Sequence, residues 1–419
     1  MEEPAPAPKS PSLSNRLRLR EFVPFVGPAF VASIAYVDPG NFATNIEAGA
    51  RFQYDLLWVL LWSNLMAILV QTLSAKLGIV TGFSLPRNCR NWFPRPVTLG
   101  LWVAGEISAL ATDLAEFLGA AIGFSLLFGW PLFPAALLTG VSVFLILAVE
   151  RLGFRRLEYL IMAFVGVISL AYVIEIVMVR PDVHAIVKHV IFPSINSQSI
   201  YVAVGMLGAT VMPHVVYLHS ALVLPRRAEL GNKDHTRHFR MERIEVLVAM
   251  NVAWVVNSAM VIMAAAVFYA HGAHVQSLQE AHQTLRPMVG QLSSVLFGIA
   301  LLASGLSSSA VGTLAGQVIL EGFLDVKMSI FLRRLLTMIP AMVVIALGLD
   351  PLKILVLSQV CLSFSLPFAI GPLVWLTSQR KVMGAHVNHR ITTAVAWLVT
   401  AIIISLNALL VYRVLGGSF

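Results

Sequence analysis

Apolar residues occur in this chain as long runs separated by short polar segments. A helix that crosses the roughly 30 Å hydrocarbon core of a membrane needs about 20 such residues, and eleven runs reach that range. Lipid leaves no water to satisfy backbone amides, so runs that are apolar on all faces are predicted to be helices. The predicted spans are residues 22–50, 54–79, 97–127, 131–149, 154–179, 199–224, 243–270, 288–320, 328–349, 351–377 and 391–415.

Proline interrupts two of these runs. The first contains "VDPGN" at 37–41 and the sixth contains "ATVMPHVVYLHS" at 209–220. A proline removes one backbone donor and clashes with the preceding turn, and Gly40 after Pro39 weakens that helix further. We therefore expect the first and sixth helices to be unwound near mid-membrane, at Pro39 and at Pro213.

The two breaks are five helices apart, which predicts a fold of two inverted five-helix repeats. The predicted fold class is an all-α integral membrane protein with about eleven transmembrane helices. Its expected parts are a disordered cytoplasmic tail at 1–21 and one transmembrane domain at 22–419, with repeats at about 22–179 and 199–377 and an extra helix at about 391–415.

Composition supports a membrane protein, with 58% hydrophobic and 12% charged residues, a mean hydropathy of +0.81 and a net charge of +8. Most of the 29 Lys and Arg residues fall in the tail and in alternate loops, including the polar loop 225–243. The positive-inside rule then predicts a cytoplasmic N-terminus and a C-terminus outside. This pattern indicates topology and weak binding of anionic lipid rather than nucleic acid. Cys89 and Cys361 predict neither a disulfide nor a cysteine metal site.

Polar groups gather at the two predicted breaks. Asp38 supplies a carboxylate, Asn41 an amide oxygen and Met212 a thioether, and unwound backbone frees carbonyls near Ala35 and Ala209. A carboxylate inside a membrane is costly and usually marks an ion pathway. Oxygen ligands alone suit Mg²⁺, Ca²⁺ or an alkali ion, whereas a thioether favours softer ions such as Mn²⁺, Fe²⁺, Co²⁺ or Cd²⁺.

These residues resemble a known family. "DPGNFATNIEAGA" in the first run and "GATVMPHVVYLHS" in the sixth are similar to the two signature motifs of the Nramp (natural resistance-associated macrophage protein) divalent-metal transporters, and "ATDLAEFLGAA" in the third run extends the resemblance. The resemblance implies the fold of the sodium-coupled amino-acid symporters and import of Mn²⁺ or Fe²⁺, and also Cd²⁺ or Co²⁺, with protons. It implies metal ligation by Asp38, Asn41, Met212, the carbonyls of Ala35 and Ala209, and Gln359.

Proton coupling needs titratable groups. Glu106, Asp113 and Glu116 are spaced by seven and three residues, so they share one face of the third helix. The resemblance implies that this stripe conducts protons together with Arg333 and Arg334, although both arginines also suit a topology anchor at a helix end.

Two histidines follow Met212 and Pro213. His214 titrates near neutral pH when unperturbed and is expected to take part in coupling or gating, and His219 matches another family histidine. We also expect metal entry to release a proton from Asp38 to Glu116.

Other functions remain open on the sequence alone. An amino-acid symporter of the same fold usually keeps an acid out of the broken first helix, so Asp38 argues against it. An intramembrane metalloenzyme needs a motif such as H-E-x-x-H, which the sequence lacks. The serine-rich stretch 304–313 does not indicate an enzyme either, because its small residues are explained by close helix packing. An ion channel fits paired breaks less well than alternating access. A Mg²⁺ carrier is disfavoured by Met212.

We expect a monomer in the bacterial inner (plasma) membrane that is no enzyme and has no prosthetic group.

Overall fold

The structure is a computed structural model, and it describes residues 26–194, 196, 198–230, 235–273, 275 and 277–414. These residues form helices and no strand. The predicted tail at 1–21 lies outside the described residues. Nine helical segments among them are long and apolar enough to cross a membrane, which confirms a multi-pass helical membrane protein.

The helices follow the predicted runs closely. Their bounds are α2 Pro28–Ala35, α3 Pro39–Phe52, α4 Leu57–Thr81, α5 Leu85–Trp92, α6 Arg95–Phe128, α7 Leu132–Glu150, α8 Phe154–Val179, α9 Val183–Ile191, α10 Ser199–Thr210, α11 Pro213–Leu222, α12 Leu224–Leu230, α13 His235–Val267, α14 Leu278–Met288, α15 Gln291–Leu324, α16 Ile330–Ala346, α17 Pro351–Ser378, α18 Arg380–Met383 and α19 Arg390–Val414.

Two predicted spans fall outside the nine. The run at 22–50 divides into α2 and α3, which have 8 and 14 residues, and the run at 328–349 becomes α16, with 17 residues. The predicted polar loop 225–243 is largely helical in its described part, because α12 and the first turns of α13 lie in it. The amphipathic helices α5, α9 and α14 were not predicted, because they are too short to produce a membrane-length run.

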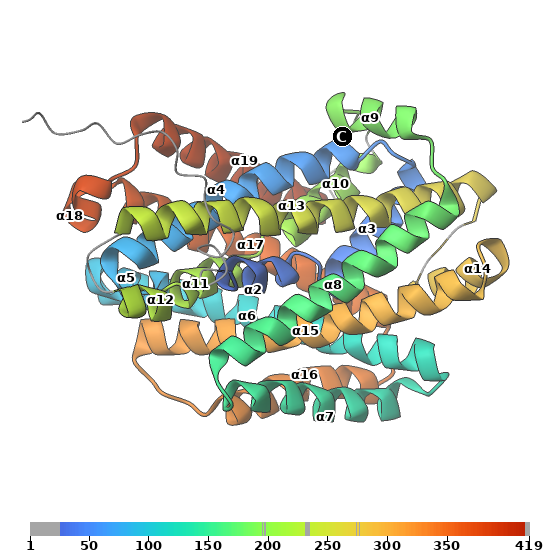
Figure 1. Ribbon diagram of the computed structural model, residues 1–419, viewed down its shortest axis with the longest axis horizontal. Coiled ribbons are helices and arrows are strands. Elements are labelled where there is room, and N and C mark those ends of the chain that lie inside the picture. The colour runs from blue at the N-terminus through green and yellow to red at the C-terminus, as the bar shows by residue number, and fades with distance from the viewer. Residues whose placement is uncertain are drawn as a thin grey trace, which may run out of the picture.

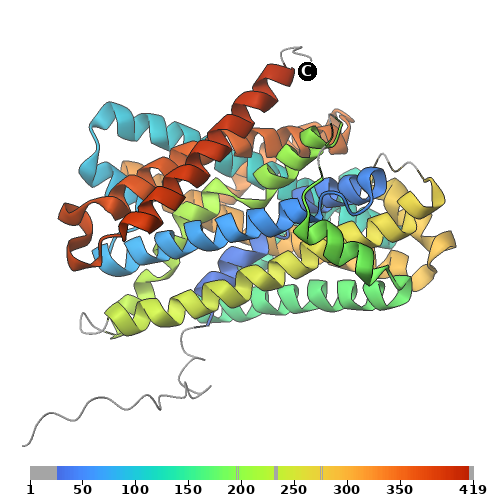
Figure 2. The ribbon, with the colours of Figure 1, turned by 90° about the horizontal axis from the view of Figure 1, so that it is seen from above.

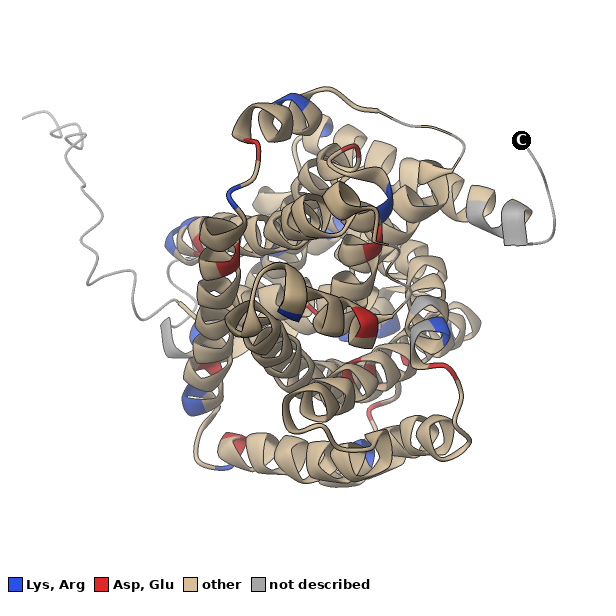
Figure 3. Ribbon diagram, turned by 90° about the vertical axis from the view of Figure 1, so that its right-hand side faces the viewer, with Lys and Arg blue, Asp and Glu red and all other residues tan. Residues whose placement is uncertain are grey.

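The long helices lie side by side and define two ends of the molecule (Figure 1). We call the end with α5, α12 and α18 the α5 end, and the opposite end, with α9 and α14, the α9 end. The last helix, α19, crosses from the α5 end towards the α9 end (Figure 2). Seen from the α9 end, most of the ribbon carries no Asp, Glu, Lys or Arg (Figure 3), in line with the low share of charged residues in the sequence.

The centre of the bundle is the contact between α6 and α15. Small residues let the two backbones approach closely. A Cβ atom on Gly305 would lie 2.5 Å from the backbone nitrogen of Ala120, and one on Gly123 would lie 2.8 Å from the backbone of Leu302. The expected close helix contact of the serine-rich stretch is therefore present, and it fixes the acidic face of α6 beside α15.

Candidate metal site

The first break separates α2 from α3. Asp38 is the N-cap of α3, in an extended conformation, and Pro39 occupies the first helical position, where a missing backbone donor has no cost. The Pro39 ring packs on Gly119 of α6, since a Cβ atom there would collide with it. Side chains from neighbouring helices support the unwound carbonyls: Asn257 donates to the Tyr36 carbonyl at 2.7 Å and Ser304 to the Val37 carbonyl at 2.5 Å.

The second break separates α10 from α11 in the same way. Met212 is the extended N-cap of α11 and Pro213 is its first residue. In a continuous helix the carbonyls of Ala35 and Ala209 would accept from residues 39 and 213, four positions later. Both of those residues are proline, so both carbonyls lack their helical donor. The two prolines thus leave equivalent carbonyls without their helical donors in two segments far apart in sequence.

Asn41 joins the two breaks. Its side-chain nitrogen donates to Asp38 Oδ1 at 2.7 Å and to the Ala209 carbonyl at 3.1 Å, and its backbone nitrogen donates to Asp38 Oδ1 at 2.8 Å. Among the described residues, Asp38 Oδ2 and Asn41 Oδ1 make no hydrogen bond of standard geometry, although both residues are fully buried and the Gln359 amide lies close to the Asp38 carboxylate. Buried polar atoms are normally satisfied, so these oxygens are available to an ion.

Met212 and Gln359, the remaining predicted side-chain ligands, are also buried. Met212 is fully buried and belongs to the same core cluster as Ala35 and Val37. Gln359 of α17 is 3% exposed, its amide makes no hydrogen bond to the described residues, and a Cβ atom on Gly40 would collide with it. No three His, Cys, Asp or Glu side chains gather as a metal site in the described part of the chain. Any ion here depends on one carboxylate with neutral ligands.

A narrow cleft reaches Gln359 from the α9 end. Its volume is about 30 Å³, and α3, α10 and α17 form its walls. The lining residues are Thr44, Glu47, Tyr201, Val202, Val204, Gly205, Gln359, Val360 and Ser363. A cavity of that size holds one or two water molecules. It is too small for an ion with a full hydration shell.

The acidic face of α6 meets α16. Glu106 pairs with Arg333 at 2.6 Å, and Asp113 pairs with Arg334 at 3.2 Å. Arg334 is fully buried and also donates to Ser309 at 2.5 Å. These contacts place charged pairs in the interior of the bundle and do more than anchor a helix end.

Glu116 differs from the other two acids because it has no ion-pair partner. Both of its carboxylate oxygens are buried, and within the described part of the chain neither makes a hydrogen bond of standard geometry, although Ser308 lies close by. The carboxyl groups of Asp38 and Asp113 are near enough to interact with it electrostatically. Glu116 therefore interacts with both the Asp38 carboxyl group and the Asp113–Arg334 pair.

The two predicted histidines have different environments. His214 Nδ1 lies 3.0 Å from Thr112 Oγ1, and its Nε2 is buried without a partner. His219 lies between Gln71 Oε1 and Glu242 Oε1, each at 2.9 Å, and Gln71 donates in turn to the Tyr36 hydroxyl at 2.6 Å. His219 and Glu242 thus form a buried hydrogen-bonded pair of titratable groups.

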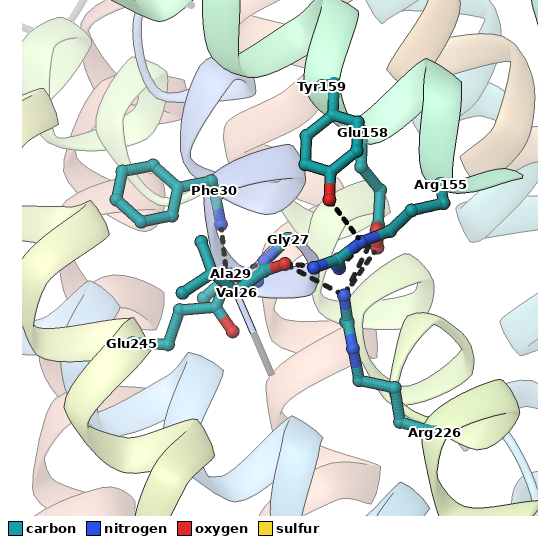
Figure 4. A network of polar contacts seen from close by, with 9 residues as sticks. All are labelled: Val26, Gly27, Ala29, Phe30, Arg155, Glu158, Tyr159, Arg226 and Glu245. Carbon is teal, nitrogen blue, oxygen red and sulfur yellow. Dashed lines mark hydrogen bonds and ion pairs between the residues drawn. The ribbon is translucent and has the colours of Figure 1, made fainter. Parts of the chain in front are cut away.

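A buried network at the α5 end holds the start of α2 (Figure 4). Glu158 of α8 accepts from Arg155 at 2.9 Å and from Arg226 at 3.0 Å, and both arginines also donate to the Val26 carbonyl. Glu245 of α13 accepts from the backbone nitrogen of Gly27 at 2.6 Å. Sequence reasoning missed this network and Glu242. Two acids in the apolar context "MERIEVLV" were the available signal, but Arg226 was attributed to topology.

Comparison with known proteins identifies the family. The family model described as "Natural resistance-associated macrophage protein-like" matches residues 29–413. The chain belongs to the Nramp family. A relative from Caldanaerobacter subterraneus is 51% identical over 402 residues, 96% of each chain, and one from Bacillus subtilis is 45% identical over 413 residues, 97% of each chain. Each is named a divalent metal cation transporter, MntH, so this Nramp protein belongs among transporters and not among enzymes, as predicted.

Solved structures agree with this assignment. The manganese transporter of Eremococcus coleocola superimposes with a TM-score of 0.85 at 33% identity, covering 96% of this Nramp chain and 87% of that one. MhsT in complex with L-phenylalanine superimposes with a TM-score of 0.59 at 12% identity, covering 91% of this chain and 98% of that one. The second likeness shows the fold alone, and it supports the expected symporter-like architecture.

Proposed function

We propose that this Nramp protein is a proton-coupled importer of divalent transition metals, Mn²⁺ and Fe²⁺ with Cd²⁺ and Co²⁺ as further substrates, working by alternating access in the bacterial inner membrane. The relatives named above support metal transport. The single observation that supports it most is the pair of unsatisfied buried oxygens, Asp38 Oδ2 and Asn41 Oδ1, at the junction of the two breaks. We assign the metal to these oxygens, the Met212 sulfur and the carbonyls of Ala35 and Ala209, with Gln359 joining on occlusion.

The chemistry of this ligand set supports selectivity for transition metals. One carboxylate, one amide and two carbonyls are hard ligands that Mg²⁺ and Ca²⁺ also accept. A thioether contributes little to those ions and binds softer dications. A single negative charge leaves a bound dication with a net positive charge, which suits transient binding and release.

The orientation we propose places the N-terminus and the α5 end in the cytoplasm and the end of α19 outside. The Glu158 and Glu245 contacts then close the cytoplasmic route by holding α2, and the cleft beside Gln359 points outside. Import requires the α2 contacts to break after the metal has bound. We further propose one transmembrane domain of eleven crossings that works as a monomer.

For the coupling ion we propose that the metal displaces a proton from Asp38 to Glu116. From there the proton moves along the carboxylates of Asp113 and Glu106 towards the α5 end, and Arg334 and Arg333 belong to the pathway as the permanently charged partners of these two acids. Glu116 can accept this proton once its own proton has passed on to Asp113, and its burial without an ion-pair partner among the described residues then favours taking the next proton up. His214 contributes to coupling or gating. His219 and Glu242, whose side chains lie 2.9 Å apart, form a second titratable pair beside α2.

The deciding experiment is uptake into proteoliposomes with an imposed pH gradient, comparing Mn²⁺, Mg²⁺ and a mixture of amino acids as competitors. We expect Mn²⁺ uptake that an acidic outside accelerates and that neither Mg²⁺ nor amino acids abolish. Preferred uptake of Mg²⁺ or of an amino acid would replace the proposal. An Asp38→Asn variant that moves protons with metal at the normal rate would refute the role of Asp38 as first proton donor.

A further inference from the structure

A polar face of α3 leads from the break to the α9 end. Gly40, Thr44, Glu47 and Arg51 are separated by four, three and four residues, so they lie along one side of the helix. Thr44 and Glu47 line the cleft described above. Asp55, just beyond α3, pairs with His189 of α9 at 3.3 Å, so this face ends at the α9 end of the molecule.

Gln359 is the inner limit of this cleft. The side chain is 3% exposed, both of its amide atoms lack hydrogen bonds to described residues, and it packs on Gly40 directly after Asp38 and Pro39. An unsatisfied amide at that depth has its oxygen free for a cation that comes down the cleft. The cleft therefore joins a surface acid to the buried ligands.

Glu47 is the charged residue that lines the cleft. Its side chain is 35% exposed, and its carboxylate lies 2.6 Å from the guanidinium of Arg51. The Arg51 side chain is 51% exposed. The other walls are mainly apolar, and apolar walls concentrate the field of a charge within a cleft. Without metal, Arg51 neutralises that field.

The Glu47–Arg51 pair is weak enough to be exchanged. An exposed pair of this spacing contributes little to the stability of a helix. A dication at the same distance from the carboxylate has twice the Coulomb attraction of a guanidinium. Arg51 has a second contact available, because its guanidinium already lies 5.2 Å from the Phe52 ring centroid. It can leave Glu47 and remain on the aromatic face.

We propose that Glu47 is an outer docking site for a hydrated divalent cation, at which the incoming ion replaces Arg51 as the partner of the carboxylate before it moves to Gln359. The inference rests on the proposed function and adds a second metal position on the entry route. A carboxylate and water are hard oxygen ligands, so this site takes Mg²⁺ or Ca²⁺ as readily as Mn²⁺. Discrimination between metals is left to the inner site.

The test is Mn²⁺ uptake kinetics in proteoliposomes for the wild type, Glu47→Gln, Arg51→Gln and the control Asp55→Asn. Asp55 has the same exposure as Glu47, 35%, and is paired at the same end, but it does not line the cleft. At low salt we expect the KM of Glu47→Gln to rise roughly three- to tenfold with kcat unchanged, and that of Arg51→Gln to fall. Asp55→Asn should match the wild type.

Competition by Mg²⁺ at constant ionic strength separates docking from a structural effect. Millimolar Mg²⁺ should raise the apparent KM for Mn²⁺ in the wild type and much less in Glu47→Gln. Equal competition in both proteins, or an unchanged KM in Glu47→Gln, would overturn the docking site while wild-type Mn²⁺ uptake still supports the transport function. A wild type without Mn²⁺ uptake would instead refute the transport function itself.

Discussion

One carboxylate oxygen of Glu245 lies 2.6 Å from the backbone nitrogen of Gly27 and also accepts from Ala29 and Phe30. These nitrogens have no acceptor within α2 because they lie at its N-terminus, where the helix dipole also favours a negative charge. Glu245 belongs to α13, and the break at Pro39 separates α2 from α3. The half-helix is thus held at its end by a neighbour and can swing away when that contact is lost.

The first prediction concerns this contact. Glu245→Gln keeps one acceptor oxygen but removes the charge. We expect it to destabilise the closed position of α2, relative to the open one, by about 1.5 kcal/mol, which shifts the equilibrium roughly tenfold towards an open cytoplasmic route. Ser33→Cys, a nearly isosteric change at a buried position of α2, reports the opening through its reaction rate with an impermeant thiol reagent from the α5 end.

The background for that measurement replaces Cys89 and Cys361. Glu321→Gln is the matched control, because Glu321 is an exposed acid in the last turn of α15 at the same end of the molecule. The control should label at the background rate. Equal labelling of Glu245→Gln and the background would show that Glu245 does not hold α2.

The second prediction concerns the cleft. A Cβ atom on Gly205 of α10 would meet no atom within 4 Å, so a side chain can be added without displacing a neighbour. Gly205→Leu should fill the cleft and lower the initial rate of Mn²⁺ uptake at least tenfold while the protein stays folded. Gly205→Ala, which also suits a helix but is smaller, is the matched control and should keep most of the rate.

Thermal unfolding of the purified variants accompanies the uptake assay, and we expect both to unfold at or above the wild-type temperature. Wild-type uptake by Gly205→Leu would mean that metal does not enter beside α10.

Local chemistry explains which features the sequence could predict. Pro39 and Pro213 act on their own helices, so both breaks and their free carbonyls were predictable without knowledge of packing. The spacing of Glu106, Asp113 and Glu116 fixed their common face for the same reason. The division of the first run into α2 and α3 also follows from Pro39.

Contacts between distant segments could not be predicted in this way. Arg226 has the composition of a topology signal, and only the packing of α8 against α2 reveals that it pairs with Glu158. Similarly, His219 was predicted without Glu242, because 23 residues and a polar stretch separate them in sequence. A single sequence contains no information about which buried acid meets which base.

The third prediction concerns proton coupling. Glu116→Gln preserves the shape of a fully buried side chain, and the amide can still contact Ser308, so the fold should tolerate the change. Mn²⁺ uptake down its own gradient should continue, but an imposed pH gradient should no longer accelerate it, and intravesicular dye should report little proton entry. Glu150→Gln, at the end of α7 and away from the acidic face of α6, should keep normal coupling. Normal proton entry in Glu116→Gln would remove this residue from the pathway.

The fourth prediction concerns selectivity. Met212 is buried at the second break, and Met212→Ala removes the soft ligand while leaving the oxygens of Asp38 and Asn41 in place. Without the thioether, the remaining ligands suit hard dications, so we expect the variant to transport Mg²⁺ and Ca²⁺ and to retain part of its Mn²⁺ uptake. Met206→Ala, a buried methionine of α10 that is not at the break, controls for the lost volume and should still exclude Ca²⁺. If Met212→Ala also excludes Ca²⁺, selectivity comes from the size of the site and not from sulfur.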